Sequence, residues 1–107
     1  MSAIKSAIAH IVTWRLNGKT AADRECQAQQ VVRAFEARRN EVPGLRRMEV
    51  GVNVVEAPDA WDVALYMEFA SRADLEAYQL HPAHLEIKQL VGPMRVARGQ
   101  ADIEIRA

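Results

Sequence analysis

The order of strand-like and helix-like segments is the feature of this sequence that most restricts its fold. Strand-like segments alternate apolar and polar residues, whereas helix-like segments place apolar residues three or four positions apart. Breaks rich in glycine, proline or asparagine separate the segments, as in "NGKT", "NEVPGL" and "GPM". The sequence predicts a strand at about 7–16, a helix at 21–40, strands at 45–56 and 61–69, a helix from Ser71 to about Val91 that is interrupted at Pro82, and a strand within 96–105.

Cap residues support these helix boundaries. Thr20 and Ser71 are suitable N-caps, because their hydroxyls can accept hydrogen bonds from the first turn of a helix. Asp23 and Asp74 follow three residues later, where a capping box places an acidic group. Pro82 fits best as the first residue of a new helical turn, because its missing N–H costs nothing there.

This βαββαβ order predicts an α+β protein with a ferredoxin-like fold, in which two helices cover one face of a four-stranded antiparallel sheet. We expect residues 1–107 to form a single domain. The strand at 61–69 carries apolar residues on both faces, and one helical layer covers only one of them. Pairing the sheets of two copies hides the other face, so the sequence predicts a homodimer that forms a dimeric α+β barrel.

Composition argues against several classes of function. Fourteen basic and fourteen acidic residues cancel, so no excess positive charge favours binding to nucleic acid or an anionic membrane. No apolar run is long enough to span a bilayer, and the N-terminus lacks the features of a signal peptide, so we expect a cytoplasmic protein. Cys26 is the single cysteine, and its neighbours predict that it is buried.

The stretch "EAYQLHPAHLEI", residues 76–87, contains two of the three histidines. One interpretation is structural: Pro82 leaves carbonyl groups without helical donors, and a histidine can bond to them. A second is acid–base chemistry, in which the break aims Tyr78 and His84 into one cavity and Asp102 orients an imidazole. A third is a metal site completed by His10, but no HExxH motif or acidic run accompanies it, and we expect no metal or cofactor.

Five segments together resemble the stress-responsive dimeric A/B barrel domain family over residues 8–105. They read "HIVTWRL", "VPGLRRMEVGVNV", "WDVALYMEF", "SRADLEAYQLHPAHLEI" and "ADIEI". The resemblance implies a ferredoxin-like α+β barrel that dimerises through its sheets. Many members have no assigned activity, and one plant member is a polyketide cyclase.

The resemblance also implies roles for particular residues. In the cyclase, a tyrosine and the second histidine of the HPxH run are the catalytic pair, and they match Tyr78 and His84 here. A strand-one histidine and a last-strand aspartate match His10 and Asp102. Trp14 differs, because it stands where a smaller apolar side chain is expected, and its bulk is enough to fill the pocket.

The predicted function is therefore that of a homodimer that binds a small apolar or aromatic molecule in a pocket between sheet and helices. Two alternatives stay open: a polyketide-cyclase-like or isomerase-like enzyme using Tyr78 and His84, and a stress-associated dimer without enzymatic activity. The sequence does not decide whether the protein is an enzyme. The residues expected to bind the ligand are His10, Val12, Trp14, Phe35 and Asp102.

Overall fold

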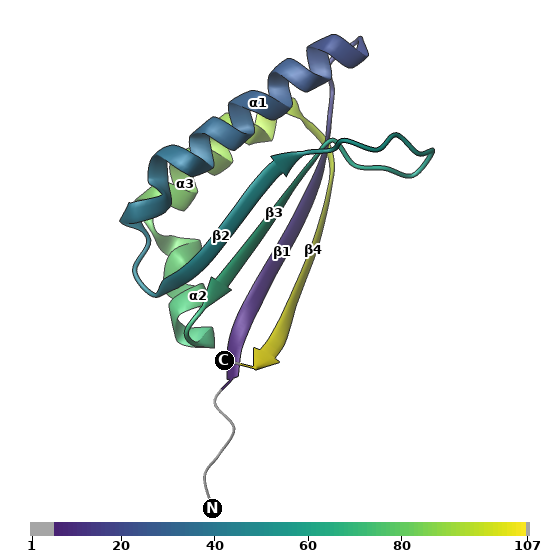
Figure 1. Cartoon of the computed structure of the whole chain (residues 1–107). Coiled ribbons are helices and arrows are strands. Elements are labelled where there is room, and N and C mark those ends of the chain that lie inside the picture. Colours follow the sequence, from purple (N-terminus) through teal and green to yellow (C-terminus); the bar gives the residue numbers. More distant parts are fainter. Residues whose placement is uncertain (1–5, 107) are drawn as a thin grey trace, which may run out of the picture.

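The computed structural model describes residues 6–106, which form one antiparallel sheet with helices on one of its faces (Figure 1). The sheet is built from four strands in the order β2-β3-β1-β4. This arrangement confirms the expected α+β ferredoxin-like fold. The elements are β1 (Ser6–Leu16), α1 (Ala21–Arg38), the 3-10 turn η1 (Arg39–Glu41), β2 (Leu45–Val52), β3 (Val63–Phe69), α2 (Arg72–Leu80), α3 (Pro82–Val91), the 3-10 turn η2 (Gly92–Met94) and β4 (Arg95–Arg106).

The hydrophobic core lies between the helices and the inner face of the sheet. Strand β3 shows the cause most clearly, because its residues alternate between buried positions, such as Leu65 and Phe69, and partly or fully exposed ones. Helix α1 adds a buried stripe of Ala28, Val31 and Phe35, spaced to share one helical face. Burial of these side chains from both layers is the main source of stability for the fold.

Local capping fixes the helix starts where the sequence predicts them. The Thr20 hydroxyl accepts a hydrogen bond from the Asp23 backbone N–H, and the Ser71 hydroxyl accepts one from the Asp74 N–H. Before β2, Gly44 has a φ of 77°, in the left-handed region that glycine tolerates best. A side chain there would collide with Asp74, so this turn also fits closely against the start of α2.

Two local predictions are wrong. Cys26 is exposed, because it lies two residues before Ala28 and therefore points away from the buried stripe of α1. Strand β2 ends at Val52 and does not continue to residue 56. Its partner β3 begins at Val63, which pairs with Val52. One further backbone bond, of 2.9 Å from the Asn53 N–H to the Asp62 carbonyl, closes the pairing.

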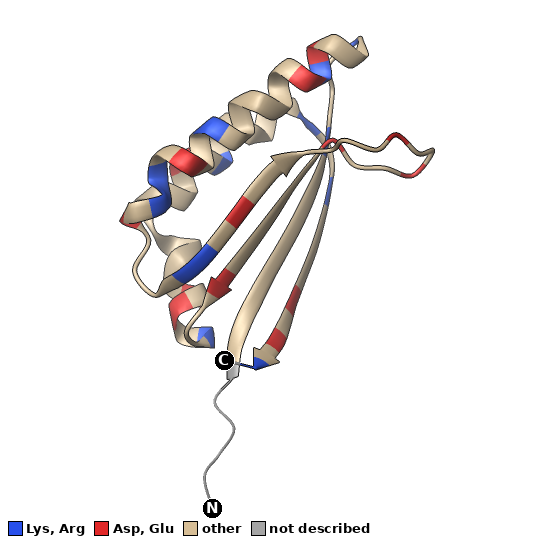
Figure 2. Cartoon of the chain, viewed as in Figure 1, with Lys and Arg blue, Asp and Glu red and all other residues tan. Residues whose placement is uncertain are grey.

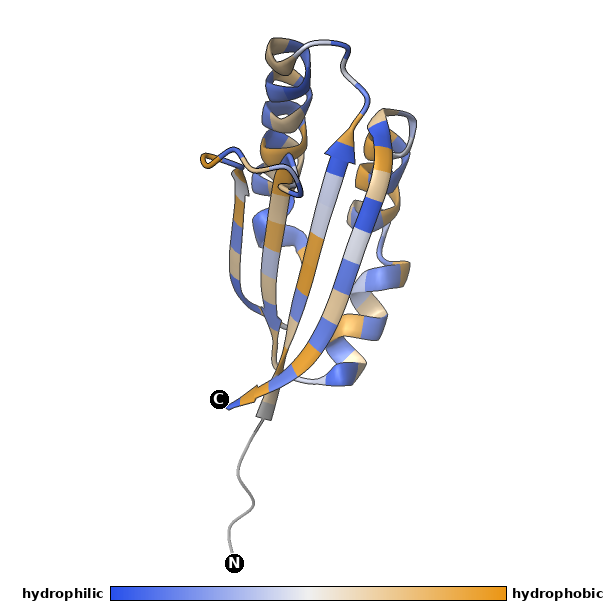
Figure 3. Cartoon of the chain, turned by 90° about the vertical axis from the view of Figure 1, so that its right-hand side faces the viewer, coloured by the Kyte–Doolittle hydropathy of each residue, from blue (hydrophilic) through white to orange (hydrophobic). Residues whose placement is uncertain are grey.

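Among residues 6–106, no helix covers the outer face of the sheet (Figure 1). Cross-strand pairs on this face are mostly small or apolar, including Ala9 with Ile103 and Ile11 with Ala101. Figure 3 shows hydrophobic and hydrophilic residues alternating along β4, as expected for a strand with two different faces. Charged residues of both signs are spread over the helices and strands in Figure 2. Within residues 6–106, no helix combines the length and the apolar character that crossing a membrane requires.

Candidate functional site

A cavity of about 570 Å³ lies between the inner face of the sheet and helices α2 and α3. Five of its lining residues were singled out from the sequence: His10, Val12, Trp14, Tyr78 and His84. The other lining side chains are partly apolar and partly polar, and the polar ones come from α2, α3 and β4. The apolar lining residues are Val12, Trp14, Leu65, Ile87 and Val91, and the other polar ones are Gln79, Lys88, Arg95, Arg98 and Gln100.

The joint between α2 and α3 positions two of these residues. Pro82 is the first residue of α3, and the preceding His81 is extended, as a residue before proline prefers. The ring nitrogen Nδ1 of His81 accepts a hydrogen bond of 3.1 Å from the Ala83 backbone N–H, which caps α3. His81 therefore belongs to the joint, while Tyr78 before it and His84 after it both reach the cavity.

Tyr78 stands between the two histidines of the cavity. Its ring centroid is 6.1 Å from that of His10 and 4.8 Å from that of His84, with edge-type packing in both pairs. The side chain is buried, and burial raises the pKa of Tyr78 well above the ordinary tyrosine value. Among residues 6–106, the Tyr78 hydroxyl is the one buried side-chain polar atom without a hydrogen-bond partner.

His84 is held in a form suited to accepting a proton. Its Nδ1 lies 3.1 Å from the carbonyl oxygen of Gln79. Because a carbonyl only accepts, Nδ1 carries the proton, and Nε2 retains its lone pair. Partial burial lowers the pKa of His84 and outweighs the opposing effect of the Gln79 bond, while the charge of nearby Lys88 lowers it further. The ring is therefore neutral near neutral pH.

His10 is oriented by a chain of side chains on β4. His10 Nδ1 lies 2.5 Å from Asp102 Oδ1, and Asp102 Oδ2 accepts a 2.7 Å hydrogen bond from Gln100 Nε2. Gln100 Oε1 in turn accepts a 2.6 Å bond from Arg98 Nη1. Partial burial opposes ionisation of Asp102, but the bonds from Gln100 and His10 outweigh it and keep the pKa of Asp102 below its ordinary value.

The register of β1 with β4 explains why these residues meet. His10 pairs with Asp102, Val12 with Gln100, and Trp14 with Arg98. Directly paired residues point to the same side of a sheet, so Asp102, Gln100 and Arg98 all face the helices.

The structure brings together most of the residues expected to bind a ligand, with two differences. Val12 and Trp14 line the cavity, and Trp14 leaves the space open. Phe35 does not line it: its ring packs in the core against Trp14, with centroids 5.7 Å apart. Asp102 is not in the wall either, and its side chain bonds to His10, which is.

Sequence reasoning missed the cationic and amide groups on this cavity. Arg98 and Gln100 precede Asp102 by four and two residues, so strand alternation placed them on the same face once Asp102 was chosen. Lys88 follows His84 by four residues, which places both on one side of α3. Among the described residues, no three His, Cys, Asp or Glu side chains gather as potential metal ligands.

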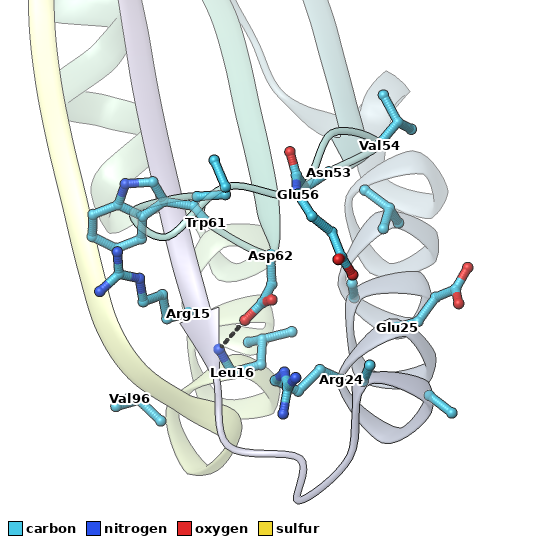
Figure 4. A pocket seen from close by; sticks show the side chains of 16 residues that line it. Arg15, Leu16, Arg24, Glu25, Asn53, Val54, Glu56, Trp61, Asp62 and Val96 are labelled. Atoms are coloured by element: carbon cyan, nitrogen blue, oxygen red, sulfur yellow. Dashed lines mark hydrogen bonds between the residues drawn. The ribbon is translucent and has the colours of Figure 1, made fainter.

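A second and larger hollow, of about 980 Å³, opens where β1 and β2 end, beside α1 and the connection between β2 and β3 (Figure 4). Arg24 and Glu25 of α1 lie on one side of it, and Trp61 and Asp62 on the other. Asp62 accepts a 2.8 Å hydrogen bond from the Leu16 backbone N–H. Its lining residues include no histidine, tyrosine or cysteine, so the smaller cavity is the better candidate for chemistry.

The smaller cavity combines three features that proton-transfer sites use. It has a neutral imidazole with a free nitrogen, a buried phenol able to donate a hydrogen bond, and a second imidazole held by a carboxylate. The apolar walls weaken competition from water for these groups.

Solved structures of known proteins share this fold. A dimeric protein of unknown function from Bacteroides fragilis is 26% identical, with a TM-score of 0.80 over 92% of this chain and 96% of that one. A dimeric ferredoxin-like protein of unknown function from Thermobifida fusca is 25% identical, with a TM-score of 0.81 over 94% and 92%. Hydroxynitrile lyase from Passiflora edulis is 19% identical, with a TM-score of 0.78 over 95% of each chain.

Sequence comparison gives the family. No curated protein sequence matches the chain. The family model described as "Stress responsive A/B Barrel Domain" matches residues 8–105, which is nearly the whole sequence. The chain therefore belongs to the stress responsive A/B barrel domain family.

Proposed function

We propose that the protein binds a small apolar or aromatic molecule bearing a carbonyl group in the cavity beside Tyr78 and His84. The observation that carries this proposal is the Tyr78 hydroxyl, which is buried without a hydrogen-bond partner. Such a group destabilises a folded protein, because it gives up its bonds to water and gains none in return. A ligand oxygen that accepts a hydrogen bond from Tyr78 removes this cost.

The proposed chemistry is proton transfer on the bound molecule. Tyr78 donates a hydrogen bond to the carbonyl oxygen, which stabilises negative charge that develops there. The Nε2 atom of His84 takes a proton from the adjacent carbon as a general base. An aldol-type cyclisation or an isomerisation proceeds through such a step. The Passiflora edulis relative is named as a lyase, so this fold accommodates catalysis.

We also infer that the protein is a homodimer joined through the outer face of its sheet. The Bacteroides fragilis and Thermobifida fusca relatives are described as dimeric. In this chain the outer face presents Ile11, Ala101 and Ile103 without a covering layer. Burial of such apolar area is worth about 25 cal/mol per Å², which favours association of two copies.

The test combines a ligand screen with removal of one oxygen atom. Aromatic ketones and polyketide-like lactones are screened by thermal shift, and binding is measured by calorimetry. For the ligands found, Tyr78→Phe is expected to weaken affinity about tenfold, the value of one buried hydrogen bond. Its melting temperature is expected to stay level or rise, because the variant no longer buries an unpaired hydroxyl.

Tyr66→Phe is the matched control for this substitution. The Tyr66 hydroxyl donates to Glu68 Oε1 at 2.7 Å, and the residue lies outside the cavity. This variant should bind like the wild type. A screen without binders, or equal affinity of Tyr78→Phe and wild type for every ligand, contradicts the proposal and favours a non-enzymatic dimer.

A further inference from the structure

The charged side chains that line the cavity are all positive. Lys88 comes from α3, and Arg95 and Arg98 come from the first half of β4. Among the described lining residues there is no aspartate or glutamate. Figure 2 shows basic residues near the start of β4, acidic ones in its second half and one basic residue at its tip, away from the cavity-lining part of the strand. The chain as a whole has no net charge, so this excess is local.

Arg98 is oriented without being neutralised. One of its nitrogens, Nη1, donates to Gln100, and Gln100 is itself held by Asp102. Within residues 6–106, Arg98 takes part in no ion pair. A guanidinium has five N–H donors in a rigid fork that fits a carboxylate. One donor is therefore used to fix the side chain, and the others stay available to a ligand.

The polarity of the cavity changes from its interior to its rim. His10 and Tyr78 are buried, at 3% and 2% exposure, and lie among apolar side chains. Lys88, Arg95 and Arg98 are exposed residues at the boundary with solvent. The Asp102 carboxylate, on the same strand as Arg98, is occupied by His10 and Gln100. A molecule that matches this gradient has an apolar body and a negatively charged end.

We propose that the ligand is an aromatic or apolar carboxylic acid whose carboxylate is bound by Arg98 at the rim, while its body lies beside Tyr78 and His84. Lys88 and Arg95 add to the attraction without fixing its direction. This inference rests on the proposed function, because it concerns the same cavity, and it adds the chemical class of the ligand. Arg98 is thus a specificity-determining residue.

The experiment compares an acid with its neutral amide. Calorimetry on the purified full chain measures Kd for 2-naphthoate and for 2-naphthamide, which have the same ring system. The wild type is expected to prefer the acid about tenfold, because hydrogen bonds to charged groups are about twice as strong as neutral ones. Added salt should weaken binding of the acid and leave binding of the amide unchanged.

Substitution of Arg98 then separates charge recognition from the pocket itself. Arg98→Gln is expected to weaken acid binding about tenfold and to change amide binding less than about twofold. Arg98→Lys keeps the positive charge but loses the paired N–H donors of the guanidinium. Its affinity for the acid should therefore lie between those of the wild type and Arg98→Gln. Arg33→Gln makes the same charge change on the exposed face of α1 and should match the wild type for both probes.

Four outcomes overturn the inference. The first is equal affinity of the wild type for acid and amide, and the second is binding of the amide alone. The third is an equal loss of affinity for both probes in Arg98→Gln, and the fourth is no binding of either probe to the wild type. The first three leave the proposed pocket intact, because the amide still binds. The fourth counts against the pocket as well. The comparison of acid with amide, and its salt dependence, need no variant, so they decide the question even if a substitution impairs folding.

Discussion

His84 shows how one residue can hold two helices together and still present a ring nitrogen to the cavity. Its Nδ1 proton is committed to the Gln79 carbonyl at the end of α2, which ties α3 to the preceding helix. The same bond fixes the tautomer and leaves Nε2 free on the cavity side. Burial and the neighbouring positive charges oppose protonation of the ring. Structural and acid–base roles are therefore compatible at this position.

The lowered pKa of His84 predicts how stability depends on pH. Below about 6.5, the ordinary histidine value, the unfolded chain binds a proton that the folded protein resists. The free energy of unfolding should therefore fall as pH drops from 6.5 to the lower folded-state pKa. His84→Gln cannot gain this charge, so it should lose less stability than the wild type between about pH 7.5 and pH 5, measured by urea unfolding.

Leu85→Gln on the same helix serves as the control, because it introduces the same amide side chain and leaves His84 in place. It should keep the pH dependence of the wild type. If His84→Gln loses as much stability on acidification as the wild type, His84 is not the group responsible.

For single residues, the sequence predicted four of the titratable side chains that lie at or beside the cavity, namely His10, Tyr78, His84 and Asp102. Tyr78 and His84 lie ring against ring, in line with the expectation that both reach one cavity. Asp102, expected to orient an imidazole beside Tyr78 and His84, bonds to His10. Alternation along the strand places Arg98 on the same face as Asp102, but its position opposite Trp14, at the cavity, depends on the register between β1 and β4. Phe35 was misplaced because core and cavity residues share the same apolar character.

The break between α2 and α3 is the element-level feature that creates the site. In an uninterrupted helix, residues six apart, such as Tyr78 and His84, point in different directions. Pro82 and the extended His81 change the direction of the chain between them, and both side chains line one cavity. Sequence predicts this break reliably, since proline imposes it directly. It predicts strand ends less well, as for β2, because these depend on the partner strand.

Pro82→Ala should therefore affect binding more than folding. The loss of conformational restriction should lower the free energy of unfolding by about 0.5–1 kcal/mol. Ligand affinity should fall further, because His81 is no longer restricted to the extended conformation and α2 and α3 can realign. Thermal unfolding and calorimetry measure the two effects.

Pro58→Ala provides the comparison, since Pro58 is exposed in the connection between β2 and β3, outside the cavity. It should leave affinity unchanged. Equal affinities for Pro82→Ala and Pro58→Ala would show that the joint does not organise the site.

In the whole molecule, the two faces of the sheet have separate tasks. The inner face forms the core and the cavity, while the outer face of the single chain is left to solvent. Ile103, on β4, is 48% exposed there. The family and the order of the elements were readable from the sequence, because both depend on patterns spread over the whole chain.

Ile103→Glu tests the proposed dimer. A twofold axis places two copies of the new charge in one apolar interface, where unpaired charges are strongly unfavourable. In light scattering after size exclusion, the wild type is expected to have the mass of a dimer at micromolar concentration, and the variant that of a monomer. Leu85 on α3 is 45% exposed, about as much as Ile103, so Leu85→Glu is the control. The Leu85→Glu protein should stay dimeric. A monomeric wild type, or a dimeric Ile103→Glu, would refute the interface.

Strand β4 links these two faces in a way that limits how the chain can vary. Its residues alternate between the wall of the cavity, as at Arg98 and Gln100, and the outer face, as at Ala101 and Ile103. Deletion of one residue within this strand moves every following side chain to the opposite face. Loss of two restores the alternation. Near its start β4 already absorbs one extra residue at a bulge, where Arg15 pairs with Ala97 but Leu16 pairs with Arg95. After this bulge, length changes that keep both faces of the strand come in even numbers.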